Sequence, residues 1–206
     1  MRPESPIEDK SNGWEAFAHE FIDRCHLSTV GAATVNAWAD TLPAHARVLD
    51  LACGPGTPRS AVLANKKLDL YAIDAAPSLV SAYQTRFPTA RIACESVEES
   101  TFFGETFDGV LAWGVLFLLH AQTQRALFPR VSSALCAGGS FLFTAPRQAV
   151  TWEDAWTKRQ SISLGEDEYR VLLAAAGLTL HAEYHDEGEN HYYHAVKLRG
   201  QPSSSV

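Results

Sequence analysis

The sequence predicts an α/β fold, in which helices cover both faces of a mostly parallel, seven-stranded sheet in a doubly wound arrangement. Between residues 46 and 144, five strand-like segments alternate with helical segments, and such an alternation forms a parallel sheet with right-handed crossovers. Two more strand-like segments follow at 178–184 and 191–198, joined by turn-forming residues at 186–190. We expect these two to form a hairpin that adds at least one antiparallel strand to the sheet.

The segment before the sheet is expected to form two helices. A repeat of apolar residues at helical spacing, typical of an amphipathic helix, runs through Trp14, Phe17, Phe21 and Cys25. A second helix is expected over about 30–40, and it ends before Pro43.

Five strands are expected in the parallel part of the sheet, at 46–51, 69–74, 90–94, 107–113 and 140–144. The fourth is nearly all apolar, which is typical of a central parallel strand that is buried on both faces. The first crossover helix is expected to begin at Thr57-Pro58, with Thr as its N-cap and Pro at its first position. The second begins at Pro77.

The last crossover helix is expected over about 122–135, and Pro129 should kink or break it. A long connection at 146–164 follows the fifth strand. Connections of this length are uncommon and often serve as lids over a site, so this one is a candidate lid. A short helix over 166–176 then ends at Gly177.

Length and composition indicate one globular domain. The chain has 206 residues, of which 46% are hydrophobic and 20% charged, and a domain holds roughly 150 residues. We expect disordered ends at 1–12 and 200–206 and a single domain over 13–199. Within that domain, 13–45 should form a helical cap and 46–199 the α/β core.

The formal net charge of −7 argues against nucleic acid as the main partner, because binding to its backbone requires a basic face. The cysteines lie far apart without a C-x-x-C pair, which is typical of reduced thiols. The polar N-terminus resembles no signal peptide, and no apolar run reaches the ~18 residues of a membrane span. We therefore expect a soluble cytoplasmic protein, monomeric or homodimeric, with no membrane or nucleic-acid partner.

The most informative segment is a glycine-rich loop after the first core strand, Val48-Leu-Asp-Leu-Ala-Cys-Gly-Pro-Gly-Thr57. Ligands of open α/β sheets bind at the carboxyl ends of strands, near the point where the strand order reverses. Gly54 and Gly56 carry no side chain that would collide with such a ligand. We therefore expect a ligand to bind at this loop.

Two nucleotide-binding motifs are disfavoured by the residues of this loop. A phosphate-binding loop requires Gly-Lys-Ser/Thr, which is absent. A dinucleotide fingerprint has a small residue three positions after Gly56, where this chain has Arg59. Asp50 would also repel a pyrophosphate, so a cationic ligand without phosphate suits the loop better.

The segment resembles the first motif of the class I, Rossmann-like S-adenosylmethionine-dependent methyltransferases, which is a hydrophobic strand, an acid and a Gly-x-Gly loop. It departs from that motif at Ala52, where the family most often has glycine, and alanine is the smallest possible replacement. The resemblance implies that the cofactor's methionine part and sulfonium are surrounded by Asp50, Ala52, Cys53, Gly54 and Gly56. S-adenosylmethionine is the implied cofactor and S-adenosylhomocysteine the implied product.

The resemblance spans roughly 46–144 and implies further cofactor contacts. Asp74 ends the second strand, where the family has an acid on the ribose hydroxyls, and Ala75 follows beside the adenine. Ser96 stands where the family usually has an Asp that binds the adenine amino group, with Val97 next to it. Glu95 is an alternative acid for that role.

Trp113 ends the fourth strand, over the region where members of the family deliver the methyl group. It begins a segment that lacks the Asn/Asp-Pro-Pro-Tyr sequence of enzymes that methylate exocyclic base nitrogens, and no Pro-Cys dipeptide of cytosine-C5 enzymes occurs. Together with the net charge, this favours a small-molecule acceptor, methylated by in-line displacement.

Catalytic residues are not evident, and His120 and His191 are weak candidates for a general base. The aromatic residues that could contact the acceptor are Trp14, Phe17, Trp152 and Tyr193. Each has a structural alternative, namely a helix start for His120, packing for the N-terminal and connection aromatics, and a surface edge strand for 191–194. His185, His191 and His194 do not have a recognised metal-binding spacing, and no metal is expected.

Two rival functions stay open. One is a non-catalytic protein that binds or senses S-adenosylmethionine, which the departures Ala52 and Ser96 favour slightly. The other is an NAD(P)-dependent oxidoreductase on the same fold, against which Arg59 and the missing third glycine count.

Overall fold

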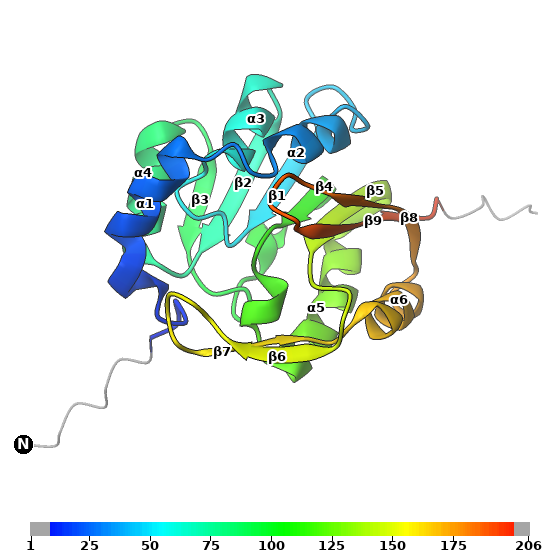
Figure 1. Cartoon of the computed structure of the whole chain (residues 1–206). Helices are drawn as coiled ribbons and strands as arrows, with labels where there is room; N and C mark the ends of the chain where they lie inside the picture. Colours follow the sequence, from blue (N-terminus) through cyan, green and yellow to red (C-terminus); the bar gives the residue numbers. More distant parts are fainter. Residues whose placement is uncertain (1–8, 200–206) are drawn as a thin grey trace, which may run out of the picture.

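The computed structural model describes residues 9–199, and its centre is a seven-stranded sheet of order β3-β2-β1-β4-β5-β9-β8 (Figure 1). The first five strands pair in parallel, whereas β9 is antiparallel to both β5 and β8. The strands are β1 (Arg47–Leu51), β2 (Asp69–Asp74), β3 (Arg91–Cys94), β4 (Phe107–Ala112), β5 (Leu135–Thr144), β8 (Leu178–His185) and β9 (His191–Lys197). The predicted doubly wound, mostly parallel sheet with an antiparallel C-terminal hairpin is therefore confirmed.

The helices also follow the predicted order. They are α1 (Ala18–Leu27), α2 (Ala32–Ala39), α3 (Arg59–Asn65), α4 (Pro77–Arg86), α5 (Ala121–Ala134) and α6 (Glu166–Ala175). Three short 3-10 helices complete the set, namely η1 (Trp14–Phe17), η2 (Phe102–Gly104) and η3 (Leu116–Leu118). The first predicted helix is thus divided into the 3-10 turn η1 and α1. Within residues 9–199 we find no helix that is both long and apolar enough to cross a bilayer.

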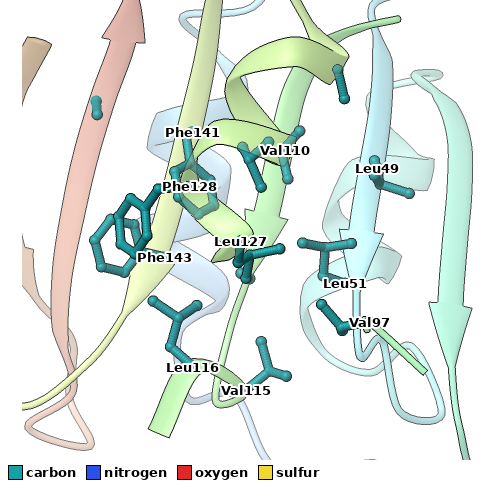
Figure 2. Close-up of a cluster of buried hydrophobic side chains, with 14 of the residues drawn as sticks. Leu49, Leu51, Val97, Val110, Val115, Leu116, Leu127, Phe128, Phe141 and Phe143 are labelled. Carbon is teal, nitrogen blue, oxygen red and sulfur yellow. The ribbon is translucent and has the colours of Figure 1, made fainter. Parts of the chain in front are cut away.

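Alternate residues of the central strands face opposite layers, as the period of a β-strand requires. Leu49, Val110 and Phe143 point toward α5, where they join a core that includes Phe128 (Figure 2). Their chain neighbours Val48, Leu111 and Leu142 pack on the other face with Trp38 of α2. Both faces of β1 and β4 are therefore buried, in agreement with the apolar sequence of the fourth strand.

A break at Pro129 and a helix start at Thr57-Pro58 were expected, and both expectations are wrong. α5 continues through Pro129 to Ala134, since the fully buried neighbours Phe128 and Val131 hold this part of the helix against the core; a kink at Pro129 stays a prediction. The peptide bond Thr57-Pro58 is cis, and α3 begins one residue later than expected, at Arg59. The Thr57 hydroxyl accepts a hydrogen bond from Arg86 of α4 (2.8 Å) and does not cap α3.

The connection at 146–164 contains a second, two-stranded sheet, formed by β6 (Val150–Glu153) and β7 (Gln160–Ser163). These strands were not predicted from the sequence, because they are four residues each and largely polar. The expectation that 191–194 forms a surface edge strand is also wrong, because β9 lies between β5 and β8.

The expected disordered segments 1–12 and 200–206 lie mostly outside the described residues. Of them, residues 9–12 are described, and they form a turn. The Asp9 carboxylate accepts hydrogen bonds from the backbone N–H groups of Ser11 (3.1 Å) and Gly13 (2.8 Å) and from Arg159 (2.8 Å). The division into a cap at 13–45 and a core at 46–199 stays a prediction.

His194 of β9 is a buried histidine within a defined hydrogen-bond chain. Trp38 donates from Nε1 to Ser140 Oγ (2.7 Å), and that hydroxyl lies 2.8 Å from His194 Nε2. Tyr184 Oη lies 3.1 Å from Nδ1. With the Ser140 hydroxyl donating to Nε2 and Nδ1–H donating to Tyr184, every polar atom of the chain is satisfied by a neutral imidazole. Burial, and secondarily the nearby His181, lowers the pKa of His194 to about 4.

This histidine is expected to make the protein less stable in mild acid. The unfolded chain takes up a proton as the pH falls below the ordinary histidine pKa of about 6.5, whereas folded His194 stays neutral until about pH 4. Unfolding is therefore favoured progressively between these values, by about 2 kcal/mol at pH 5 relative to pH 7. Urea unfolding at both pH values should show that the wild type loses this much more stability than His194→Gln. Parallel losses in the two proteins would contradict the prediction.

Candidate functional site

A cavity of about 740 Å³ lies at the carboxyl ends of the parallel strands. Its walls are formed by the residues that follow β1, β2, β3 and β4, including Gly54, Ala75, Ser96 and Trp113. The strand order reverses between β1 and β4, and this reversal point is where ligands bind in open α/β sheets. The cavity therefore occupies the position that the sequence analysis predicted for a ligand.

A cover over the cavity is formed by residues 9–28 and by the loop at 154–159 between β6 and β7, which Figure 1 shows side by side. Trp156 of that loop lies 6.1 Å from the Trp14 ring, 6.1 Å from Phe21 and 6.2 Å from Phe17. Trp14, Phe21, Asp154 and Arg159 all line the cavity. The candidate lid thus lies over the cavity and contacts the N-terminal segment.

The N-terminal segment is also fixed to the sheet side of the cavity. Glu15 accepts hydrogen bonds from the backbone N–H (3.0 Å) and the hydroxyl (2.6 Å) of Ser78, in the first turn of α4. A carboxylate at a helix N-terminus is stabilised by the exposed N–H groups and the helix dipole. This contact holds Trp14 at the cavity wall.

The glycine-rich loop turns through backbone conformations that favour glycine. Gly54 (φ +58°) and Gly56 (φ +79°) are both left-handed. Gly54 lines the cavity, and its N–H donates to Asp74 Oδ2 (2.8 Å). Gly56 does not line the cavity; a Cβ there would lie 2.4 Å from Phe87 and 2.8 Å from Tyr83. Gly54 therefore faces the space for a ligand, whereas Gly56 allows α4 to pack against the loop.

Asp74 lies at the end of β2 and lines the cavity, although it is only 7% exposed. Its two oxygens accept hydrogen bonds from the backbone N–H groups of Gly54 (2.8 Å) and Ala76 (2.9 Å). Burial raises the pKa of this carboxyl to about 6, against the opposing effect of these hydrogen bonds. Asp74 thus fixes the loop and keeps lone pairs on both oxygens for further donors.

Asp50 does not reach the cavity. Its carboxylate is buried and accepts a hydrogen bond from Ser60 Oγ (2.5 Å) at the start of α3. Burial raises its pKa to about 6 as well. Cys53 is likewise buried and outside the cavity lining. These two residues support the loop from behind, while Ala52 lines the cavity.

The three residues after β3 that were assigned to the adenine all line the cavity, namely Glu95, Ser96 and Val97. Glu95 accepts a hydrogen bond from Ser100 Oγ (2.6 Å). Ser96 is 7% exposed. The structure therefore brings both candidate polar groups to the wall beside Ala75.

The wall at the end of β4 is built on Trp113. Its Nε1–H donates to Tyr192 Oη (2.6 Å), and the Tyr192 hydroxyl donates to Asp186 Oδ2 (2.7 Å). The guanidinium carbon of Arg59 lies 3.7 Å from the centre of the Trp113 ring. In the sequence, Arg59 indicates only a residue too large for a dinucleotide loop, and this contact was not predicted.

Some of the candidate residues for acceptor binding and catalysis line the cavity, and others do not. Trp14 and His120 line the cavity. Phe17 and Trp152 do not, but Trp152 packs 5.4 Å from Phe117, which does.

Tyr193 and His191 lie on β9 and are buried outside the cavity lining. The Tyr193 ring stacks on Phe143 (4.8 Å) in the core beneath α5 and α6. His191 Nδ1 lies 3.0 Å from His185 Nε2, and its Nε2 lies 2.9 Å from Glu183 Oε2. Tyr193 therefore packs in the core, and His191 contacts neighbouring side chains on the sheet; neither residue contacts the cavity.

Several apolar cavity residues were missed, namely Phe21, Leu79, Phe117, Leu118 and Leu119. The run Val115–Leu119 carries a usable signal, because an apolar segment directly after a strand's carboxyl end is placed at the ligand edge. No group of three or more His, Cys, Asp or Glu side chains that could hold a metal ion occurs in residues 9–199.

The sequence matches a family model described as a methyltransferase domain over residues 48–139. That match begins at the glycine-rich loop and ends in the first part of β5, so it contains the donor side of the cavity described above. The chain carries a class I S-adenosylmethionine-dependent methyltransferase domain. No curated protein matches the sequence.

Solved structures of similar fold are also methyltransferases by name. One is a 1,6-didemethyltoxoflavin-N1-methyltransferase from Burkholderia thailandensis, with bound 1,6-didemethyltoxoflavin and S-adenosylhomocysteine; it is 19% identical, with a TM-score of 0.69 over 95% of this chain and 93% of that one. A second is a TehB-like methyltransferase from Corynebacterium glutamicum, 18% identical, with a TM-score of 0.67 over 88% of this chain and 98% of that one. At these identities the methyltransferase domain shares their fold.

Proposed function

We propose that this protein is a cytoplasmic enzyme that transfers the methyl group of S-adenosylmethionine to a small-molecule acceptor. The observation that carries the proposal is the covered cavity of about 740 Å³, with a glycine-rich loop and Asp74 on one wall and aromatic side chains on the other. Small-molecule sites are usually concave, largely apolar and about 300–1,000 Å³ in volume. The oligomeric state in this proposal is a monomer or a homodimer.

The residues at the cavity fit S-adenosylmethionine. Asp74 offers unoccupied lone pairs that suit ribose hydroxyl donors, and Ser96 or Glu95 suits the adenine amino group. Ala52 and Gly54 leave room for the methionine part beside the loop. Trp14 Nε1–H is buried in the cavity wall without a hydrogen-bond partner in the described part of the chain, so it is available to an acceptor atom of a ligand.

When bound, this cofactor supplies an electrophilic methyl group on a sulfonium, which an acceptor atom attacks in line. The contribution of the protein is to orient the two reactants and to exclude water, since positioning and desolvation dominate such reactions. Trp113 and Val115, after β4, form the wall over which the acceptor would lie. The aromatic cover of Trp14, Phe21 and Trp156 separates that space from solvent.

A general base is needed only for some acceptors. An amine or thiol loses its proton to solvent before reaction, whereas a hydroxyl more often needs help. Of the two candidate bases, His120 is at the cavity and His191 is not. His120 is therefore the residue that we propose as a base if the acceptor is a hydroxyl.

The aromatic walls favour a planar or amine-bearing acceptor. Rings such as Phe117 and Trp14 stack on planar groups and attract cations. Structures of similar fold are consistent with this class, because by name they include the toxoflavin N1-methyltransferase, an amino pentose methyltransferase and a glycopeptide N-methyltransferase. The position of Arg59 disfavours NAD(P), since it fills the small-residue position of a dinucleotide loop.

Calorimetric titration and a turnover assay test this proposal. We expect S-adenosylmethionine and S-adenosylhomocysteine to bind with micromolar affinity, and NAD and NADP to give no binding heat. Incubation with labelled S-adenosylmethionine and a panel of planar amines, amino sugars and phenols should then release S-adenosylhomocysteine in an acceptor-dependent way. Donor binding without turnover of any acceptor would favour the non-catalytic alternative, and binding of NAD(P) alone would contradict the proposal.

A further inference from the structure

Arg59 is a buried cation at the cavity wall that forms no salt bridge within the described residues. It is the first residue of α3, lines the cavity and is 8% exposed. Its guanidinium donates a long hydrogen bond of 3.5 Å to the Val30 carbonyl. The Cys25 thiol also lies beside it, but a neutral thiol is a weak acceptor.

The nearby carboxylates are engaged elsewhere. Asp50 accepts the Ser60 hydroxyl (2.5 Å) and lies behind the loop. Asp186 accepts hydrogen bonds from Tyr192 (2.7 Å) and from the backbone and side chain of Asn190 (both 3.0 Å). Arginine stays protonated even when it is buried, and an unpaired buried ion carries a large desolvation cost. Asp50 and Asp186 therefore stabilise the positive charge of Arg59 through space, but neither carboxylate forms a hydrogen bond with its guanidinium.

The guanidinium is held against Trp113. Its central carbon lies 3.7 Å from the centre of the Trp113 ring, and that ring is fixed by its hydrogen bond to Tyr192. Stacking of this kind restrains the guanidinium plane. The N–H groups lie in the plane, and a planar fork of N–H donors matches the two oxygens of a carboxylate.

We propose that Arg59 binds a carboxylate inside the cavity. The proposal rests on the proposed function only for the identity of the donor. Two molecules could supply the carboxylate, namely the amino-acid end of S-adenosylmethionine or an acidic acceptor. In either case the anion offsets the charge of Arg59, which would otherwise lie unpaired near the cationic sulfonium.

The test uses two pairs of ligands that differ in their carboxylate. S-adenosylhomocysteine carries the amino-acid end, and 5′-methylthioadenosine lacks it. Benzoate carries a carboxylate, and benzamide does not; both are titrated with and without S-adenosylhomocysteine present. The variants are Arg59→Met, which keeps an apolar chain on Trp113, and Arg59→Lys, which keeps the charge without the fork. Arg125→Met is the matched control, because Arg125 on α5 forms a surface ion pair with Glu168 on α6.

We expect Arg59→Met to weaken one carboxylate ligand by about 10- to 100-fold, the range for charge-assisted hydrogen bonds, and to leave its uncharged partner unchanged. Loss confined to S-adenosylhomocysteine assigns the carboxylate to the donor, and loss confined to benzoate assigns it to the acceptor. Unchanged S-adenosylhomocysteine affinity, together with no carboxylate-dependent binding of benzoate to the wild type, overturns the proposal. If Arg59→Met does not fold, the same comparisons are made with Arg59→Lys.

Failure of this proposal is distinguishable from failure of the proposed function. Wild-type protein that binds neither S-adenosylhomocysteine nor 5′-methylthioadenosine contradicts the proposed function, and the benzoate pair then still tests Arg59 in the free protein. Binding of both nucleosides with equal affinity by wild type and Arg59→Met, without benzoate binding, leaves the proposed function intact and removes the role of Arg59.

Discussion

Replacing Asp74 with alanine is expected to weaken the binding of S-adenosylmethionine by about 1.5–3 kcal/mol, the usual contribution of a hydrogen bond to a charged group. Asp74 is the buried carboxylate of the cavity wall, and it already orders the loop through Gly54. Its removal therefore deletes the proposed ribose contact and loosens the loop at the same time. Calorimetric titration of the folded variant measures the change.

Asp69→Ala is the matched control, because Asp69 begins the same strand at the end away from the cavity and forms exposed ion pairs with Arg47 and Arg91. Its affinity should equal that of the wild type. Unchanged affinity in a folded Asp74→Ala variant would remove Asp74 from the donor site.

The same residue should make donor binding depend on pH. Burial raises the pKa of Asp74 to about 6, and a ligand that donates hydrogen bonds to the carboxylate favours its ionised form. Affinity should therefore be full above about pH 7 and fall as the pH drops through 6. The fall should be smaller in Asp74→Ala.

Gly56→Ala is expected to destabilise the protein by about 2–4 kcal/mol, through backbone strain and overpacking together. The added Cβ would lie 2.4 Å from Phe87 and 2.8 Å from Tyr83, and the residue has φ +79°. Tyr83 is fully buried between Cys53 and Ala72, so it has no space into which it can move. Thermal and urea unfolding measure the loss.

The variant Gly177→Ala separates the effect of backbone strain from that of overpacking. Gly177 is also left-handed, with φ +72°, but a Cβ there would meet no atom within 4 Å. This variant should lose only the conformational part, roughly 1 kcal/mol. Equal losses in both variants would show that packing of α4 against the loop does not require glycine at position 56.

The order of the elements could be predicted from the sequence because each strand–helix unit carries its own local signals. β2 is the clearest case, since an apolar run ends in Asp74 and Pro77 begins the next helix. The glycine-rich loop and Asp74 could be placed at one site because carboxyl ends of neighbouring parallel strands meet at one edge. The cavity wall from Ala52 to Trp113 follows from that rule.

The remaining features depend on tertiary packing that local patterns do not encode. The alternation of β9 puts His191 and Tyr193 on one face of the sheet, but which face meets the cavity depends on α5 and α6, whose core encloses Tyr193. β6 and β7 are stabilised by pairing with each other and by contact with η3, and each strand is only four residues long, too short for its pattern to predict a strand. In the sequence, Arg59 served only to disfavour a dinucleotide-binding loop, because no local pattern predicts that its side chain packs on Trp113.

The cover over the cavity comes from stretches of chain that flank the segment shared with other methyltransferases. The matched segment, 48–139, holds the glycine-rich loop and Asp74, whereas Trp14, Trp156 and Arg159 lie before or after it. In the proposed function the donor contacts lie inside the matched segment, whereas the acceptor would meet both that segment, at Trp113 and Val115, and the cover outside it. We therefore expect substitutions in the cover to change which acceptors fit the cavity while the glycine-rich loop and Asp74 stay in place.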